Sequence, residues 1–387
     1  MMRRIALILG AAVLACAAAY SEETNMDAVL ARSLVSMGNT ARIDHALAKA
    51  RRGETVTVSV IGGSITAGAV ASKWELNYGS LLAEWWRKTF PQAKIELVNA
   101  GIGATGSDYG TLRAQRDLLA KNPDFVVVEY GVNDGDTQQC AETYEGLLRQ
   151  ILKRPNHPAV VMEFMMNNAG GNAQAWQSKL GKQYDLPMVS YRDALWPEIQ
   201  AGRMKWEDVS GDVIHPNDRG HAFVAQIVER VLQAALDKLP ADEDLPEIKP
   251  VPEPLLTDMF ENVDLFEADA LTPVKNEGWT FDKDNHCWKS DTPGSVIEFE
   301  VAGRAIFAMT FTIKGPMGKA NIQVDDLPPL KVDGWFDQTW GGYRPTWLLT
   351  KDLKLAKHRV RVTLLDEKDE GSTGHEFRIM GLGVGGL

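Results

Sequence analysis

Short apolar runs alternate with stretches of helical spacing along the first half of this chain. The runs are TVTVSVIGG (55–63), KIELVNA (94–100), DFVVVEYG (124–131), AVVMEFMM (159–166) and PMVSY (187–191), with helical stretches near 78–90, 108–121, 140–153 and 173–184. Apolar strands that alternate with helices are typical of a parallel sheet covered on both faces. We therefore expect a doubly wound α/β domain, which ends in a helix from about Pro216 to Lys238.

The pattern changes after residue 238. The stretch LPADEDLPEIKPVPEPLL (239–256) holds five prolines and a run of acids, which cannot continue a helix. Five short alternating runs follow, separated by Gly, Pro and Asp turns: SVIEFEV, AIFAMTFTI, ANIQVDD, HRVRVTLLD and FRIMGLGV. This pattern predicts an antiparallel sandwich. We expect an α/β domain at 25–238, a linker or surface strap at 239–256, and a smaller all-β, jelly-roll-like sandwich at 257–387.

The first residues have the pattern of a secretory signal. Arg3 and Arg4 precede a short apolar run, and small residues follow it, so residues 1–20 predict export to the periplasm or the extracellular space. The run VLAC also resembles a bacterial lipoprotein site, and acylation of Cys16 is the one route by which we expect membrane attachment. Without Cys16 only Cys140 and Cys287 remain, and these are expected to be buried free thiols.

Charge and glycine spacing bear on the possible ligands. Forty-one Lys and Arg face 52 Asp and Glu, and the formal charge of −11 argues against a nucleic-acid partner. The stretch NAGIGATGS (99–107) contains G-x-G-x-x-G, but it follows the second predicted strand, where a dinucleotide fingerprint usually follows the first. We expect no nucleotide cofactor. We also expect no metal, because no His or carboxylate cluster has metal-ligand spacing.

Ser64 directly follows the first predicted strand, in VIGGSITAG. The carboxyl end of a parallel strand faces the crevice where open α/β sheets bind ligands, so Ser64 is well placed as a nucleophile. Thr66 stands where a G-x-S-x-G elbow would need glycine. The alternative is a serine that only caps the next helix.

Two further motifs supply partners for a nucleophile. In SGDVIHPNDRGH, His215 can act as a base for a hydroxyl and Asp212 can orient it, although a capping Asp beside an incidental His is the alternative. His221 is expected to pack in the helix. In VVVEYGVNDGD, the amide of Asn133 can donate to a developing oxyanion, although Asn-Asp-Gly is also a common turn sequence.

Taken together, these blocks resemble the SGNH hydrolase superfamily, also called GDSL-type esterases. Ser64 in GGSIT, the loop NAGIGATGS, Asn133 in GVND and the pair Asp212 and His215 occur in family order, and the resemblance covers about residues 50–235. It implies a three-layer α/β/α, flavodoxin-like fold. It also implies that Ser64 is the nucleophile, His215 the base and Asp212 the acid that orients the base.

The resemblance also implies an oxyanion hole. Its donors would be the Ser64 backbone N–H, the Asn133 side chain and one backbone N–H from Gly103 or Ala104. The chain departs from the family pattern in two places, with GGS where many relatives have GDS and with Ala104 at the position of a usual glycine. A backbone donor survives that change if alanine tolerates the local φ and ψ.

The expected function is a secreted serine esterase that removes O-acetyl groups from a polysaccharide without a cofactor. This follows from the resemblance, because secreted members joined to jelly-roll-like modules often resemble carbohydrate acetylesterases. Three alternatives stay open: a lipid esterase or thioesterase that acts on longer acyl chains, a non-catalytic glycan-binding protein, and a nucleotide-dependent oxidoreductase.

Several aromatic and amide residues are candidates for substrate contact. The stretch DGWFDQTWGGYRPTW (333–347) is the best sugar-binding candidate, although each of Trp279, Trp288, Trp335, Trp340 and Trp347 taken singly is expected to pack in the core. Trp85 and Trp86 are also expected to be packing residues. Asn167 and Asn168, after the fourth strand, are possible contacts at the cleft.

Overall fold

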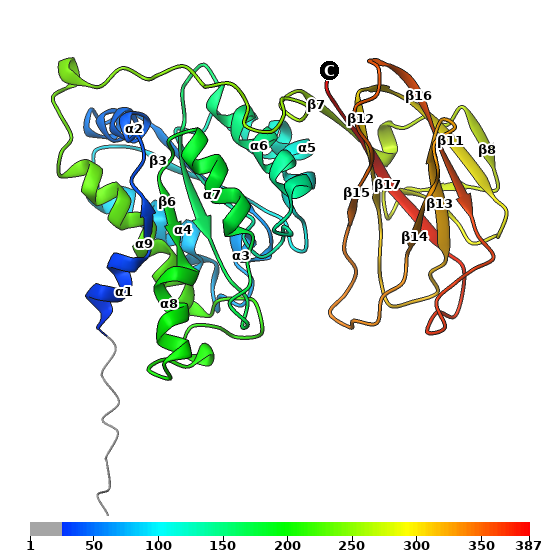
Figure 1. Cartoon of the computed structure of the whole chain (residues 1–387), viewed down its shortest axis with the longest axis horizontal. Coiled ribbons are helices and arrows are strands. Elements are labelled where there is room, and N and C mark those ends of the chain that lie inside the picture. Colours follow the sequence, from blue (N-terminus) through cyan, green and yellow to red (C-terminus); the bar gives the residue numbers. More distant parts are fainter. Residues whose placement is uncertain (1–24) are drawn as a thin grey trace, which may run out of the picture.

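A computed structural model describes residues 25–387, which form two domains side by side (Figure 1). The N-terminal domain is α/β and the C-terminal domain is all β, which confirms the predicted fold class. The expected signal at residues 1–20, with Cys16, lies outside the described residues. Among residues 25–387, no helix combines the length and the apolarity needed to cross a bilayer.

The α/β domain is built on one six-stranded sheet in the order β1-β6-β5-β4-β2-β3. Its strands are β1 (Leu34–Ser36), β2 (Val56–Gly62), β3 (Ile95–Gly101), β4 (Phe125–Glu129), β5 (Ala159–Phe164) and β6 (Met188–Ser190). Strands β2 to β6 pair in parallel, and every residue of β2, β4 and β5 is buried. Continuous β-branched and apolar runs suit such strands, because both of their faces are covered.

Helices cover both faces of this sheet and complete three layers. One apolar core joins the sheet to α1 (Met26–Arg32), α2 (Ala41–Arg51), α4 (Tyr78–Thr89), α8 (Tyr191–Gln200) and α9 (Asp218–Leu236). A second core, on the opposite face, joins it to α5 (Ser107–Asp117), α6 (Gln138–Leu152) and α7 (Gln174–Gln183).

The structure differs from expectation at three places in the α/β domain. Strand β1 is an antiparallel edge strand on β6, and neither α1 nor β1 is apparent from apolar spacing. The run PMVSY stops being a strand at Ser190, whose side chain accepts the Asp193 N–H and begins α8. The last helix starts at Asp218, not at Pro216, because Asn217 caps it by accepting the Gly220 N–H (3.0 Å).

The C-terminal domain packs two antiparallel sheets face to face. One sheet has the order β15-β12-β17-β10-β9, with β7 also on β17, and the other has the order β14-β13-β16-β11-β8. The strands are β7 (Val263–Glu267), β8 (Lys275–Glu277), β9 (Thr280–Asp282), β10 (Cys287–Ser290), β11 (Val296–Gly303), β12 (Ala305–Thr310), β13 (Lys319–Val324), β14 (Leu330–Asp333), β15 (Thr346–Thr350), β16 (Ala356–Leu364) and β17 (Phe377–Gly385). Alternate residues of β13 and β16 are buried between the sheets, as a sandwich requires.

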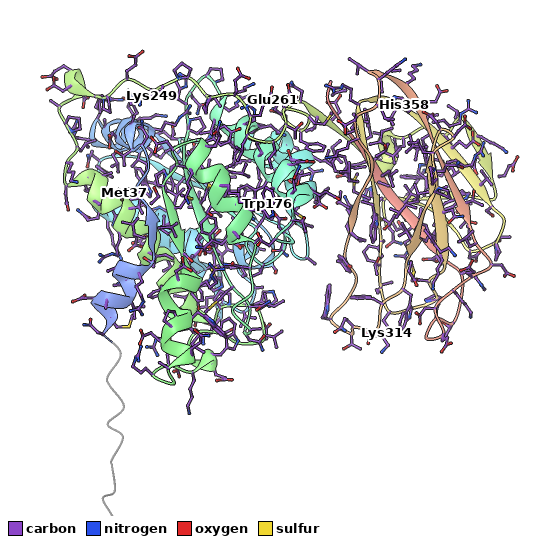
Figure 2. All side chains as sticks on the ribbon, viewed as in Figure 1. Met37, Trp176, Lys249, Glu261, Lys314 and His358 are labelled. Carbon is purple, nitrogen blue, oxygen red and sulfur yellow. The ribbon has the colours of Figure 1, made fainter. Side chains whose placement is uncertain are left out.

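The proline-rich stretch is a bound strap that runs over the α/β domain to β7 (Figure 1). The buried Glu145 carboxylate of α6 accepts three consecutive N–H groups of the strap, from Leu255, Leu256 and Thr257, at 2.5 to 2.9 Å. Arg149 donates to the Pro252 carbonyl (2.7 Å) and pairs with Glu261 (2.6 Å), which Figure 2 labels where the strap reaches the sandwich. The strap therefore fixes the path of the chain between the domains.

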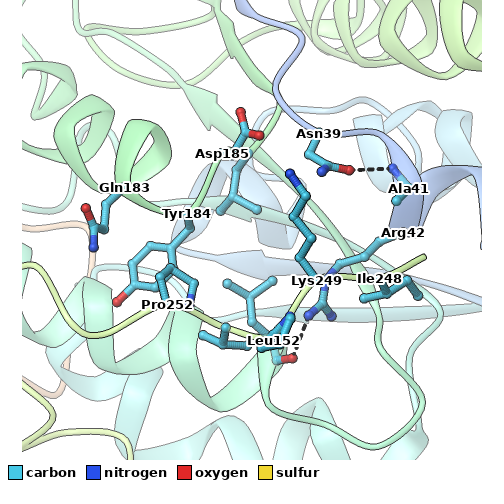
Figure 3. A pocket seen from close by; sticks show the side chains of 13 residues that line it. Asn39, Ala41, Arg42, Leu152, Gln183, Tyr184, Asp185, Ile248, Lys249 and Pro252 are labelled. Atoms are coloured by element: carbon cyan, nitrogen blue, oxygen red, sulfur yellow. Dashed lines mark hydrogen bonds between the residues drawn. The ribbon is translucent and has the colours of Figure 1, made fainter. Parts of the chain in front are cut away.

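A cavity of about 240 Å³ lies between the strap and the α/β domain (Figure 3). Lys249 and Tyr184 line it, and Arg42 crosses it to donate to the Leu152 carbonyl (3.0 Å). The lining includes Leu152, the last residue of α6, and residues 183–186, which come just before β6. The cavity therefore lies at the amino edge of the parallel sheet, opposite the edge that carries Ser64.

The two domains share an apolar interface. Tyr109 and Leu112 of α5 join a cluster with Phe260, Phe307 and Met309. Contact is close, since a Cβ added to Gly383 of β17 would lie 2.5 Å from Leu112 Cδ1. A salt bridge between Lys351 and Glu142 also joins the domains.

Candidate active site

Ser64 stands at the carboxyl edge of the parallel sheet, one strand in from the side that ends with β3. Strand β2 lies between β3 and β4 and ends at Gly62, and Ser64 begins the four-residue helix α3 (Ser64–Ala67) two residues later. A Cβ added to Gly62 would lie 2.3 Å from the Glu129 carbonyl oxygen, so a side chain has no room there. The order of the strands reverses at β2, and open α/β sheets bind ligands at such a switch point.

The structure brings His215 to Ser64 from 151 residues away in the chain, together with Asp212. Ser64 Oγ lies 2.8 Å from His215 Nε2, and His215 Nδ1 lies 2.7 Å from Asp212 Oδ2. The predicted nucleophile, base and orienting acid therefore form one hydrogen-bonded chain. In this arrangement His215 can take the Ser64 proton while Asp212 holds the ring.

The Asp212 carboxylate is surrounded by hydrogen-bond donors. Its Oδ1 accepts the N–H groups of Ile214 and His215, each at 2.7 Å, in addition to the contact of Oδ2 with the imidazole. Partial burial would raise the pKa of Asp212, but these hydrogen bonds outweigh it and hold the pKa below its usual value. Asp212 is therefore ionised at neutral pH.

Asn133 and Gly103 both border Ser64. A Cβ added to Gly63 would lie 2.1 Å from Asn133 Oδ1, so the amide packs directly on the glycine that replaces the Asp of GDS. A Cβ on Gly103 would lie 3.7 Å from Ser64 Cβ, which places the glycine loop on the other side of the nucleophile. Ala104 has φ +55°, the left-handed conformation that glycine favours, so alanine keeps the backbone shape expected of the usual glycine.

Two buried carboxyls beneath this edge were missed by the sequence reasoning. Glu129 of β4 and Glu163 of β5 are register partners on neighbouring strands, and both are fully buried. Glu129 Oε1 accepts the Gly131 N–H (2.9 Å), whereas Glu129 Oε2 and both oxygens of Glu163 have no hydrogen bond of ordinary geometry within residues 25–387. Weaker contacts with the Thr66 hydroxyl and with the Tyr191 backbone N–H lower the pKa of Glu129 and of Glu163, respectively, by less than burial raises it. Burial raises the pKa of Glu129 to about 7 and raises the pKa of Glu163 well above its usual value.

Asp134 ties the Asn133 turn to the glycine loop. Its Oδ1 accepts the Ser107 N–H at the start of α5 (2.8 Å). Burial raises the pKa of Asp134 to about 8, with a smaller contribution from nearby Asp108. The two loops that border Ser64 are therefore joined to each other.

The second domain reaches the glycine loop. A cavity of about 540 Å³ lies between the domains and is lined by residues that include Gly103, Tyr109, Glu267, Tyr343 and Arg344. Arg344 bonds both Tyr109 (2.9 Å) and Glu267 (2.7 Å). Gly103 links this cavity to Ser64, because a Cβ added to this lining residue would lie 3.7 Å from Ser64 Cβ.

The candidate aromatic loop lies partly at this cavity. Phe336, Trp340 and Tyr343 form a cluster with ring centroids 5.2 to 5.6 Å apart, and Trp340 is 59% exposed. The other four tryptophans of the sandwich are buried or half-buried, as expected of packing residues: Trp279, Trp288, Trp335 and Trp347. Trp340 is thus the one tryptophan among residues 333–347 whose ring is largely open to solvent.

The remaining candidates have structural contacts. Asn167 Oδ1 accepts the N–H groups of Ala169 and Gly171 within its own turn, and the Asn168 N–H donates to the Val213 carbonyl (2.9 Å). His221 and Trp86 are buried and Trp85 packs against the core, as expected.

Both remaining cysteines are free thiols; Cys287 is buried, but Cys140 is only half-buried. In the part of the chain that the structure describes, no cluster of three or more His, Cys, Asp or Glu side chains could hold a metal ion.

Comparisons with known proteins agree with this geometry. Residues 60–223 match the model of the GDSL-like lipase/acylhydrolase family. Thioesterase 1/protease 1/lysophospholipase L1 of Escherichia coli (strain K12) is 29% identical over 188 residues, which are 46% of this chain and 83% of that protein.

A solved structure is similar over both domains. The crystal structure of a two-domain esterase (CEX) active on acetylated mannans is 32% identical and has a TM-score of 0.84, with 92% of this chain and 98% of that chain covered. Its structure co-crystallised with mannopentaose has the same identity and coverage, with a TM-score of 0.83. The chain described here belongs to the GDSL-like lipase/acylhydrolase family and is a carboxylic ester hydrolase.

Proposed function

We propose that this protein is a serine esterase that removes O-acetyl groups from a polysaccharide, with an acetylated mannan as the first candidate substrate. The observation that carries this proposal is the hydrogen-bonded chain from Ser64 through His215 to Asp212 at the switch point of the sheet. The mannan candidate is supported by the two-domain relative. That esterase is active on acetylated mannans, and this chain is similar to it over 98% of its length.

The proposed reaction is acyl transfer in two steps. His215 Nε2 takes the proton of Ser64 Oγ, which attacks the acetyl carbonyl carbon, and His215 then protonates the departing sugar oxygen. Water, deprotonated by His215, attacks the acetyl-enzyme, and acetate leaves as the proton returns to Ser64. Asp212 holds the imidazole orientation and stabilises its charged form.

The oxyanion that forms in each step needs donors that are already in place. The Ser64 N–H, the amide of Asn133 and a backbone N–H of the loop at Gly103 or Ala104 are the proposed donors, because Asn133 and Gly103 both border Ser64. Loss of one such donor typically lowers turnover about 10²–10³-fold.

The cavity between the domains is the proposed place for the sugar chain. Tyr109 and Tyr343 give it aromatic faces, and Arg344 and Glu267 give it charged hydrogen-bonding groups. Sugars present both apolar faces and hydroxyl groups, so a lining of this kind suits them. Export after removal of residues 1–20, with or without acylation of Cys16, is part of the same proposal, since it would place the enzyme where polysaccharides occur.

Acetate release from acetylated mannan and acetylated xylan, measured for wild type and for Ser64→Ala, tests the proposed function. We expect Ser64→Ala to lower turnover about 10⁴-fold or more without a change in the thermal midpoint. The half-exposed Ser178→Ala on α7 is the matched control and should retain full activity. Wild-type turnover by Ser64→Ala would refute the mechanism.

The nature of the acyl group is tested with the same proteins. Acetyl, butyryl and octanoyl esters of one alcohol separate an acetylesterase, which should act fastest on the acetyl ester, from a lipid esterase or thioesterase. Faster turnover of the octanoyl ester would refute the acetyl assignment while leaving the Ser-His-Asp mechanism intact.

A further inference from the structure

The segment after the Ser64 helix has an unusual backbone. Helix α3 ends at Ala67 and is capped by Gly68, with φ +91°, and Val70 follows with φ +68°. Glycine adopts this left-handed region freely, but a β-branched residue there is a rare outlier because its side chain crowds the backbone. Val70 is also 44% exposed, so burial in a core does not account for its conformation. Strain of this kind persists only where surrounding contacts enforce it.

The Val70 side chain lies on the loop that carries the base. A Cβ added to Gly211 would lie 2.2 Å from Val70 Cγ1, so Val70 covers the Cα of Gly211. The Gly211 N–H in turn donates to the His215 carbonyl (3.0 Å), which closes the turn that presents Asp212 and His215. Val70 therefore contacts this turn at the point where it closes.

The neighbours of Val70 bind the start of α9. The Ala69 N–H donates to the Ser64 carbonyl (3.0 Å), and the Ala69 carbonyl lies 3.2 Å from His221 Nε2. Ser72 donates its N–H (2.7 Å) and its Oγ hydroxyl (2.6 Å) to the two carboxylate oxygens of Asp218. Residues 68–72 thus form a bridge between the nucleophile helix and the segment that carries the base.

The base loop is held on its other side as well. The Asn168 N–H, in the segment after β5, donates to the Val213 carbonyl (2.9 Å). Contacts at Gly211 and at Val213 therefore flank Asp212. The distance of 2.8 Å between Ser64 Oγ and His215 Nε2 depends on where these contacts place the loop.

We propose that Val70 is a positioning residue of the esterase, whose side chain packs on Gly211 and keeps His215 within hydrogen-bond distance of Ser64. The proposal rests on the proposed function, because Val70 touches no reacting atom and acts only through the Ser64 and His215 pair. Glycine at position 70 would relieve the backbone. A valine there is therefore explained by its contact with Gly211 and not by local stability.

The first test replaces Val70 with glycine. We expect Val70→Gly to lower kcat about 10- to 100-fold, because a displacement of about 1 Å in a catalytic group can lower rates about 10²-fold. KM should change little, and the thermal midpoint should stay the same or rise. Val70→Ile should keep near wild-type kcat, and Val274→Gly, at a comparably exposed valine of the sandwich, should leave kcat unchanged. Unchanged kcat for Val70→Gly, or a loss of kcat together with a lower midpoint, overturns the proposal.

A double-mutant cycle tests the contact itself. Gly211→Ala should lower kcat, because the new Cβ would meet Val70 Cγ1 at 2.2 Å. Adding Val70→Ala removes Cγ1 and leaves the two Cβ atoms 3.5 Å apart, an ordinary contact, so the double variant should be faster than Gly211→Ala alone. If the fold-loss in kcat of the double variant equals the product of the losses in the two single variants, the two positions are independent and the proposal is overturned.

The two proposals fail in different ways. If Ser64→Ala is inactive and Val70→Gly is fully active, the esterase mechanism stands and the role of Val70 is refuted. If Ser64→Ala retains activity, the proposed function is refuted and Val70 loses the pair on which its role depends. Inactivation by a p-nitrophenyl phosphonate, in which Ser64 Oγ displaces nitrophenolate, gives a second readout and should be slower in Val70→Gly.

Discussion

Asp212 at the edge of the sheet and Glu129 inside it carry the same chemical group in opposite environments. The Asp212 side chain is 43% exposed, and its oxygens accept three hydrogen bonds, which hold its pKa low. Glu129 is fully buried with few donors, and burial raises its pKa to about 7. The charged form is favoured where donors are concentrated and disfavoured where they are scarce.

Glu145 combines the burial of Glu129 with the many hydrogen-bond donors of Asp212. It is as buried as Glu129, yet its two oxygens accept four hydrogen bonds, from Tyr184 and from three strap N–H groups. Asp212 is therefore exposed and has several donors, Glu145 is buried and has several donors, and Glu129 is buried and has few. Substitution by the matching amide should affect each of them differently.

The largest effect is expected at Asp212. Asp212→Asn keeps the shape but presents a different hydrogen-bonding pattern to His215 Nδ1, so the imidazole is held in the wrong tautomer, and we expect kcat to fall about 10³–10⁴-fold. Acetate release at saturating substrate measures it. The 93%-exposed Asp366→Asn in the sandwich serves as the control. A loss of less than about tenfold would show that the donors around Asp212 serve the loop and not the base.

An intermediate effect is expected at Glu145. Glu145→Gln turns one acceptor into an N–H group that faces other N–H groups, and the free energy of unfolding should fall by about 2–3 kcal/mol. Urea unfolding at pH 7 measures this change. Glu247→Gln, on an exposed part of the strap, is the matched control and should be neutral. Equal stability of the two variants would mean that the strap contributes nothing through Glu145.

The smallest effect is expected at Glu129, and it should have the opposite sign. The raised pKa means that the folded protein binds more protons than the unfolded chain between about pH 4.5 and 7, so this group lowers stability as pH rises through that window. Glu129→Gln removes the titration and retains an acceptor for the Gly131 N–H. It should match wild type near pH 4.5 and exceed it by about 1–2 kcal/mol at pH 8.5. Urea unfolding at both values measures this, and a variant less stable than wild type at pH 8.5 would contradict it.

Much of the fold could be predicted because its signals are local. Apolar runs located β2 to β6 within a few residues, and alternation located the longer strands of the sandwich. Ser64, Asn133 and the Asp212 and His215 pair could be singled out because each follows a strand or precedes a helix. In a doubly wound sheet such positions meet at one edge, where the structure places them.

The remaining features depend on contacts between distant segments. Glu129 and Glu163 each look like one polar residue near the end of an apolar run, and their pairing exists only because β4 lies beside β5. Val70 has a positive φ and contacts Gly211, which lies 141 residues later in the chain, and the local sequence predicts neither feature. Proline and acidic content predicted an irregular stretch at 239–256, but not that the α6 carboxylate of Glu145 would bind it.

The bound strap also determines how the two domains encounter a ligand. Because residues 255–257 are held on α6, the free length between the domains is a few residues, far less than a flexible chain of the whole proline-rich stretch would give. A flexible linker would let the sandwich move through a large volume, so its effective concentration near Ser64 would be low. A short, fixed linker keeps the effective concentration of the sandwich near Ser64 high. If the proposed function holds, a glycan bound at Ser64 would have the loop with Trp340 within the same molecule at a fixed place, with no separate step of capture and delivery.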